Sequence, residues 1–201
     1  MNNAKIQLMG LMFIAAGSLL SGCSNEVSYG DAKEVETVTV EYGSTDLQSL
    51  AAKMASSLAD SPAVREASAS GRPVLFVDSI RNKTSEHIDT EALTDSIRTQ
   101  LLRTGKFRFV DMSKVQSVKD QLEYQQQSGM VNPAAAVRLG KQTGAQYMLY
   151  GNLASIVKDN GKVKDVFYQL TMNLMALESG ELIWGDQQEI RKQSRKKTLG
   201  W

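Results

Sequence analysis

Cysteine, histidine and proline are all scarce in this sequence, and each shortage excludes a class of structure or chemistry. Cys23 is the only cysteine, so one chain cannot form an internal disulfide. His87 is the only histidine, and the acidic residues are not grouped as in a calcium-binding loop, so no metal ion is expected. No proline lies between Cys23 and Pro62, which excludes a proline-rich linker there.

The sequence also lacks an excess of charge of either sign. It has 23 basic and 22 acidic residues, and loss of residues 1–22 would remove one basic residue, Lys5. The remainder would then be neutral. Neutrality argues against nucleic acid as a partner, because proteins that bind nucleic acid normally carry a positive excess.

Motifs of catalysis and cofactor binding are missing too. Neither of the two short apolar segments predicted as strands is followed by a P-loop or a GxGxxG turn. Ser85, His87 and Asp89 have the residue types of a hydrolase triad, but they are neighbours in one polar loop, whereas triad members converge from separate elements. We therefore expect no catalytic residue and no cofactor, and predict that the protein acts by being bound.

The first residues have the composition of an export signal. Lys5 precedes an apolar run over residues 6–20, which is too short to span a bilayer comfortably. The sequence Leu20-Ser21-Gly22-Cys23 resembles the lipobox of bacterial lipoproteins. This resemblance implies that residues 1–22 are a cleaved signal peptide and that Cys23 is lipidated; the alternative is an uncleaved anchor with a chance cysteine.

A lipidated Cys23 would hold the protein firmly on a membrane, because two or more acyl chains anchor far better than one. Ser24 follows it, where by resemblance to sorting rules in enteric-type bacteria an aspartate would retain the protein at the inner membrane. We therefore expect an outer-membrane protein that faces the periplasm. Residues 23–43 are interpreted as the lipidated N-terminus and a tether, in which residues 35–42 are a candidate strand.

Residues 44–190 are predicted to form one α/β domain. A helix over residues 44–60 is indicated by a capping box of Thr45 and Gln48 and by apolar residues at helical spacing. A loop over residues 61–72 follows. Short apolar strands at 74–77 and 107–110 are separated by a polar loop over 78–89 and by a helix from Thr90 to Gly105. A strand, helix and strand at this spacing predict parallel pairing with a right-handed crossover.

The second half of the domain is predicted to begin with two helices, which start near Ser113 and Asn132. Three strand segments come after them, at residues 145–157, 162–177 and 181–190, and Gly161 and Gly180 mark hairpin turns between the segments. The predicted fold is a single domain with a mixed sheet of four to five strands, a parallel βαβ unit plus an antiparallel meander, flanked by helices. Residues 191–201 are interpreted as a basic C-terminal tail, either solvated or in contact with anionic lipid or an acidic partner.

Residues 73–190 resemble LpoB-type lipoproteins, which are outer-membrane activators of class A penicillin-binding proteins. The resemblance rests on residues 73–111, 143–155 and 174–192, in this order behind a lipobox. It implies a fold related to the N-terminal domain of TolB. It also implies that the protein binds a class A penicillin-binding protein and stimulates peptidoglycan synthesis. We expect a monomer.

One departure from the family leaves alternatives open. The best-known members carry a long proline-rich linker, whereas this tether is short, so either the synthase domain comes closer or another envelope protein is the partner. Residues 105–111 and 144–153 also resemble the curli-secretion lipoproteins, CsgG-like, which assemble into a channel. A third possibility is a structural envelope lipoprotein without an enzyme partner.

Candidate partner contacts are Arg81, Asn82, Lys83 and Thr84, in the polar loop after the first strand. The plainer interpretation is a connecting loop held by asparagine turn chemistry. Trp184 in the last strand is a second candidate anchor, although a tryptophan within a strand is more often part of the core. Interfaces favour arginine and tryptophan as anchors, which is why these positions are singled out.

Overall fold

The computed structural model describes residues 28–36, 39–69, 71–111 and 144–196, with the single positions 114, 117, 120 and 124. The chain divides into two compact units, residues 1–32 and 33–201, and every element below belongs to the second. Cys23 and the expected signal peptide lie outside the described residues. Most residues of the two helices expected to start near Ser113 and Asn132 also lie outside the described residues.

A mixed sheet of six strands forms the centre of the domain, in the order β3-β1-β4-β5-β6 with β2 also paired to β4. The strands are β1 (Val74–Val77), β2 (Arg81–Lys83), β3 (Arg108–Val110), β4 (Tyr147–Asp159), β5 (Val163–Ala176) and β6 (Leu182–Arg195). β1 runs parallel to β3 and β4, and β4, β5 and β6 form an antiparallel meander. The predicted single mixed α/β fold, with a parallel unit and a meander, is confirmed.

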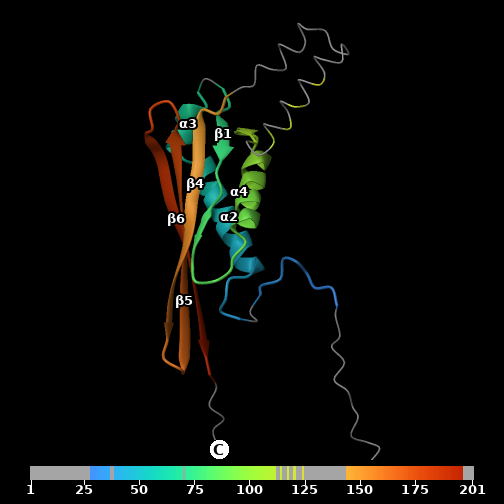
Figure 1. The fold of residues 1–201 in the computed structure, drawn as a ribbon, viewed down its shortest axis with the longest axis vertical. Helices are drawn as coiled ribbons and strands as arrows, with labels where there is room; N and C mark the ends of the chain where they lie inside the picture. Colours follow the sequence, from blue (N-terminus) through green and yellow to red (C-terminus); the bar gives the residue numbers. More distant parts are fainter. Residues whose placement is uncertain are drawn as a thin grey trace, which may run out of the picture. The chain divides into compact units, whose positions relative to one another are not determined.

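Three helices lie wholly within the described residues and accompany the sheet: α2 (Ser44–Ala59), α3 (Pro62–Ala67) and α4 (Thr90–Arg103). Figure 1 shows α2 and α4 beside each other on one face of the sheet, and α2 contacts both α4 and β6. Every second residue of β5 from Val166 to Leu174 is buried, as expected for a strand with one face against a core. The helices contribute Leu50, Met54 and Leu58 from α2 and Leu93, Ile97 and Leu101 from α4.

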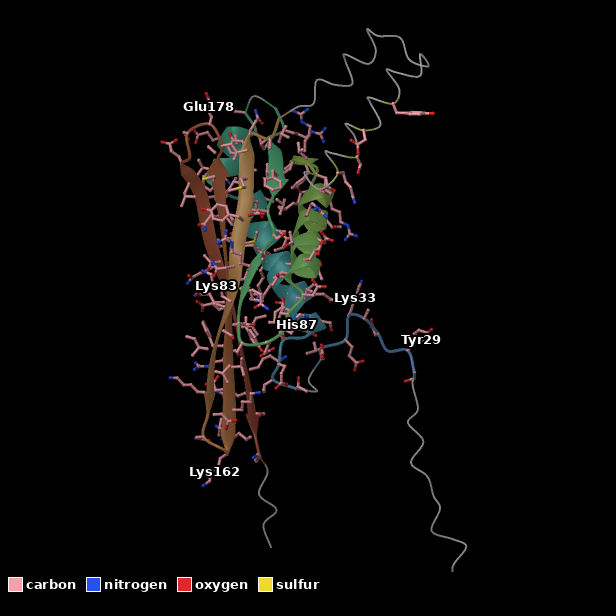
Figure 2. The ribbon with its side chains drawn as sticks, in the orientation of Figure 1. Tyr29, Lys33, Lys83, His87, Lys162 and Glu178 are labelled. Atoms are coloured by element: carbon pink, nitrogen blue, oxygen red, sulfur yellow. The ribbon has the colours of Figure 1, made fainter. Side chains whose placement is uncertain are left out.

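The meander is longer than the helices that cover it. Figure 1 shows its lower part, which includes the β4–β5 turn, continuing past the ends of α2 and α4. Figure 2 places Lys162 at this end and Glu178 at the opposite end. The burial of β4 changes accordingly: Leu149 and Leu153 are almost fully buried, whereas Ile156 and Val157 are 59% and 43% exposed.

Several local predictions were wrong. α2 is capped by Gly43, whose N–H donates to the Asp46 carboxylate at 2.9 Å, and not by the predicted pair of Thr45 and Gln48. A six-residue helix, α3, lies within the expected loop over residues 61–72. It is too short to show apolar periodicity, but Ser61 at its N-cap accepts a hydrogen bond from the backbone N–H of Val64.

The strands also differ from the predictions in three places. β2 lies within the expected polar loop over residues 78–89, which raises the strand count from the predicted four or five to six. β6 continues to Arg195, so residues 191–195 are strand rather than tail. The described positions of residues 35–42 form no strand. Polar side chains on exposed strands account for the first two differences, since they leave no apolar alternation to detect.

Gly151 offers a test of how closely β4 and β5 pack. A Cβ at this position would lie 2.4 Å from the Thr171 carbonyl oxygen and 2.8 Å from the Met172 side chain. We expect Gly151→Ala to lower the free energy of unfolding by about 1–3 kcal/mol, because the strands must separate. Urea denaturation measures this. Gly144→Ala, where a Cβ would meet open space, is the control and should change stability far less.

Candidate partner-binding site

β2 brings the candidate contact residues to an edge of the sheet. Arg81 pairs with Asn152, Asn82 with Leu153 and Lys83 with Ala154. Because side chains alternate along a strand, Arg81 and Lys83 share one face and Asn82 occupies the other. Arg81 and Lys83 are exposed, and within the described residues β2 pairs on one side only.

Asn82 and Thr84 have a different role, which is to hold the loop that follows β2. The Asn82 side-chain oxygen accepts from the backbone N–H of Thr84 at 2.9 Å. The Asn82 amide nitrogen donates to the Glu86 carbonyl oxygen, also at 2.9 Å. This asparagine turn fixes the shape of the loop. Of the four predicted contacts, Asn82 and Thr84 form hydrogen bonds within the loop, whereas Arg81 and Lys83 are exposed; contact with a partner stays a prediction for all four.

The other residues singled out in the sequence have structural positions. Trp184 is half-buried and packs against the core, as the plainer interpretation had it. His87 is exposed in the loop before α4. Among the described residues, no group of three His, Cys, Asp or Glu side chains could hold a metal ion. In the same part of the chain, no helix is long and apolar enough to cross a membrane.

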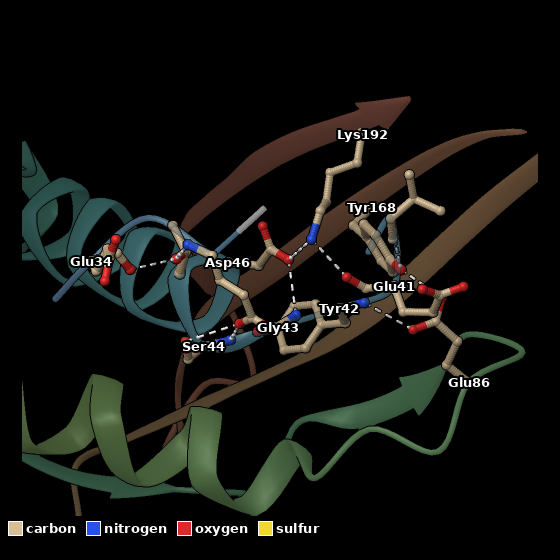
Figure 3. A network of polar contacts seen from close by, with 12 residues as sticks. Glu34, Glu41, Tyr42, Gly43, Ser44, Asp46, Glu86, Tyr168 and Lys192 are labelled. Atoms are coloured by element: carbon tan, nitrogen blue, oxygen red, sulfur yellow. Dashed lines mark hydrogen bonds and ion pairs between the residues drawn. The ribbon is translucent and has the colours of Figure 1, made fainter. Parts of the chain in front are cut away.

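Residues 39–43, which we call the strap, join the expected tether to α2 and are fastened to the sheet. Val40 is 8% exposed and belongs to the core cluster. Glu86, from the loop after β2, accepts a hydrogen bond from the backbone N–H of Tyr42 at 3.0 Å and another from the Tyr168 hydroxyl at 2.5 Å. Figure 3 shows Glu86 between these two tyrosines. One carboxylate thus links the strap, the β2 loop and β5.

Lys192 makes the second attachment of the strap. Its ammonium group donates to the Glu41 carbonyl oxygen at 2.7 Å and lies 2.9 Å from the Asp46 carboxylate (Figure 3). The side chains of Lys192 and Asp46 are only 17% and 8% exposed. Since Asp46 also caps α2 through Gly43, this ion pair joins β6, the strap and the start of the helix.

The electrostatics of the strap follow from these contacts. The ammonium of Lys164 donates to Glu41 at 2.7 Å and, with a further hydrogen bond from Thr39, lowers the pKa of Glu41 to about 2. Burial, followed by the hydrogen bond to Glu86, raises the pKa of Tyr168 well above its usual range. Both groups therefore keep one protonation state throughout the physiological pH range.

Sequence reasoning missed the residues that fasten the strap. Glu86 and Tyr42 are 44 positions apart, and Lys192 and Asp46 are 146 apart, so no local pattern connects them. Only Tyr168 could have been singled out from the sequence, because the alternating pattern of β5 places it at a buried position. A buried tyrosine normally needs a hydrogen-bond partner, and here the partner is Glu86.

A comparison with protein families matches residues 46–190 to the family described as peptidoglycan-synthase activator LpoB. The match covers most of the chain. The chain belongs to the LpoB family. The LpoB proteins named penicillin-binding protein activators in Salmonella typhimurium and Citrobacter koseri are 29% and 30% identical to it over 120 residues. These alignments cover 60% of this chain and 53% of each relative, so the chain spans about half the length of the curated relatives it matches.

Solved LpoB structures are also similar. The LpoB C-terminal domain from Salmonella enterica aligns with 28% sequence identity and a TM-score of 0.41, over 72% of this chain and 94% of that one. The LpoB C-terminal domain from Escherichia coli aligns with 22% identity and a TM-score of 0.45, over 72% of this chain and 98% of that one. The family match includes β2, its loop and the partners of the strap in β5.

The contribution of the Lys192–Asp46 ion pair to stability can be compared with that of the exposed Arg191–Asp165 ion pair. Lys192→Met leaves the buried Asp46 carboxylate without a cation, and we expect the free energy of unfolding to fall by about 2–4 kcal/mol. Arg191→Met removes an ion pair with Asp165 in which the arginine is 62% exposed, so its loss should be about 1 kcal/mol or less. Urea denaturation compares the two. Equal losses would contradict this account of the strap.

The pKa of Glu41 gives a pH-dependent test. Because the folded-state pKa is lowered, the pair with Lys164 contributes stability above the ordinary glutamate pKa of about 4.3, and this is lost as the pH falls toward about 2. A carboxyl titration by NMR should find the pKa of Glu41 near its low value in the unaltered chain and raised toward the ordinary value in Lys164→Met, where the hydrogen bond from Thr39 remains. Lys158→Met is the control and should leave the titration unchanged; an ordinary pKa in the unaltered chain would contradict the contact.

Proposed function

We propose that this protein binds and activates a class A penicillin-binding protein, and so regulates peptidoglycan synthesis from the outer membrane. The observation that carries this proposal is the family match over residues 46–190. The similar LpoB proteins of Salmonella typhimurium and Citrobacter koseri are named penicillin-binding protein activators. In this proposal the chain is a monomeric regulator and not itself an enzyme.

The geometry supports a role in binding. An activator must bind the active conformation of the synthase more tightly than the inactive one, and a tenfold difference corresponds to about 1.4 kcal/mol. A rigid surface delivers such a difference best, because little ordering is needed on binding. Contacts restrain the β2 edge: β4 pairs with it, and Asn82 and Glu86 hold the loop after it.

Within this edge we assign the contacts to Arg81 and Lys83. Both are exposed on one face of β2, and arginine is enriched among residues that dominate interface energies. The unpaired side of an edge strand can also bind an extended segment of a partner through backbone hydrogen bonds. Asn82 and Thr84 contribute by fixing the conformation of the contact residues.

A glycan-polymerisation assay tests the proposal. Residues 24–201 are added to the purified class A penicillin-binding protein of the same bacterium, and the rate of glycan-chain synthesis is measured. We expect stimulation by the unaltered chain, and about tenfold weaker half-maximal stimulation by Arg81→Glu/Lys83→Glu, because both contacts become repulsive.

The matched control is Lys53→Glu/Arg72→Glu, which reverses two exposed charges outside β2 and should retain full stimulation. Failure of the unaltered chain to stimulate would contradict the proposed activity. If the β2 double variant stimulates as well as the unaltered chain, the assignment of the contacts to Arg81 and Lys83 is contradicted, but the proposed activity is not.

Anchoring through Cys23 is proposed for the location. The lipobox-like sequence Leu20-Ser21-Gly22-Cys23 supports it. Cys23→Ala is expected to block lipidation, so that the protein accumulates unprocessed or leaves the outer-membrane fraction. Membrane fractionation and the mass of the mature N-terminus measure this. An unchanged outer-membrane distribution would contradict the anchor, whereas Ser24→Ala is a control that should fractionate normally.

A further inference from the structure

Four cations gather where the β4–β5 turn meets the end of β6. The backbone N–H of Lys196 donates to the Lys162 carbonyl oxygen at 3.0 Å, and Arg195 pairs with Val163. Lys158 stands on β4 just before the turn. We call Lys158, Lys162, Arg195 and Lys196 the basic tip. All four are exposed, and none forms a salt bridge with another described residue.

The acidic residues at this end of the meander are already engaged. Asp165 is held by Arg191 at 3.0 Å, and the Asp159 carboxylate accepts a hydrogen bond from the backbone N–H of Gly161 at 2.7 Å. The opposite turn of the meander carries Glu178 and Glu181 and no basic residue. Charge is therefore polarised along the meander, whose strands of up to 14 residues span about 45 Å.

Apolar side chains accompany these cations. Ile156 and Val157 are 59% and 43% exposed, and they lie within about 14 Å of the turn along β4. Because side chains alternate along a strand, Ile156 shares the face of Lys158 and Val157 lies on the opposite face. Three of the four cations are lysines, which act as hydrated point charges and suit a diffuse anionic surface better than a defined carboxylate site.

The path of the chain leads to the same end. Glu41 of the strap contacts Lys164, two residues along β5 from Lys162. The strap precedes α2 and follows the segment that begins at Cys23. Before the strap, Glu34 and Glu36 are hydrogen-bonded to Ser44 and Thr45 at the start of α2. Glu36 lines one pocket with Lys164 and Ser194, which precedes Arg195 of the basic tip. A lipid anchor at Cys23 would therefore attach to the domain beside this pocket.

We propose that the basic tip docks on an anionic lipid surface and orients the domain, with the acidic turn at Glu178 directed away from the membrane. This inference deepens the proposed function, since it uses the proposed anchor, but its test requires neither the anchor nor a synthase. Each lysine near an anionic surface is expected to change partitioning about fivefold. The attraction is electrostatic, so raising salt from about 0.1 M to about 1 M, which shortens the Debye length from about 10 Å to about 3 Å, should abolish it.

Sedimentation with lipid vesicles tests the proposal. Residues 24–201 are mixed with vesicles of phosphatidylcholine alone or with added phosphatidylglycerol, at low and high salt. We expect binding to the anionic vesicles at low salt only. Lys162→Glu/Lys196→Glu should reduce partitioning at least about 25-fold, because two attractive charges become repulsive. Lys53→Glu/Arg72→Glu makes the same change in net charge elsewhere and should retain most of the binding.

Three results would overturn the proposal: no binding by the unaltered chain, equal binding to neutral vesicles, or equal losses in the two double variants. Thermal unfolding establishes that both variants fold. The glycan-polymerisation assay separates this inference from the proposed function. A chain that binds vesicles through the tip but stimulates no synthase contradicts the function alone, and the reverse result contradicts the docking alone.

Discussion

The burial of one face of β5 is the constraint on which the rest of the structure depends. Five alternate residues, from Val166 to Leu174, face the helices, and a slip of one residue would turn all of them toward solvent. The same alternation fixes the register of β4 and β6. It also places Tyr168 and Lys192 on the helix side, where the strap passes. The position of the strap follows from this one pattern.

Buried polar groups make the arrangement specific. Tyr168 brings a hydroxyl into the core, and Asp46 brings a carboxylate to the start of α2, so each requires a partner. Glu86 and Lys192 meet these requirements and fasten the strap as they do so. The strap is therefore fastened to β5, β6 and the β2 loop together.

Elements with apolar periodicity could be predicted from the sequence, and elements without it could not. The helices at α2 and α4, the parallel pair β1 and β3, and the meander follow from apolar spacing and glycine turns. β2 was missed because Arg81, Asn82 and Lys83 are all polar, and α3 because it has only six residues. Arg81–Lys83 stood out in the sequence as polar residues after a buried strand, and their contact with a partner stays a prediction. The attachments of the strap could not be predicted, because they join residues distant in sequence.

Family membership and geometry together support the proposal of a domain that binds its partner at the β2 edge and is anchored through the strap. The central claim is that its partner is a class A penicillin-binding protein. Affinity capture tests this most directly, with residues 24–201 as bait in an envelope extract and mass spectrometry as the readout. The account predicts selective enrichment of a class A penicillin-binding protein, reduced when Arg81→Glu/Lys83→Glu is the bait. Enrichment of other envelope proteins without any such synthase would contradict it.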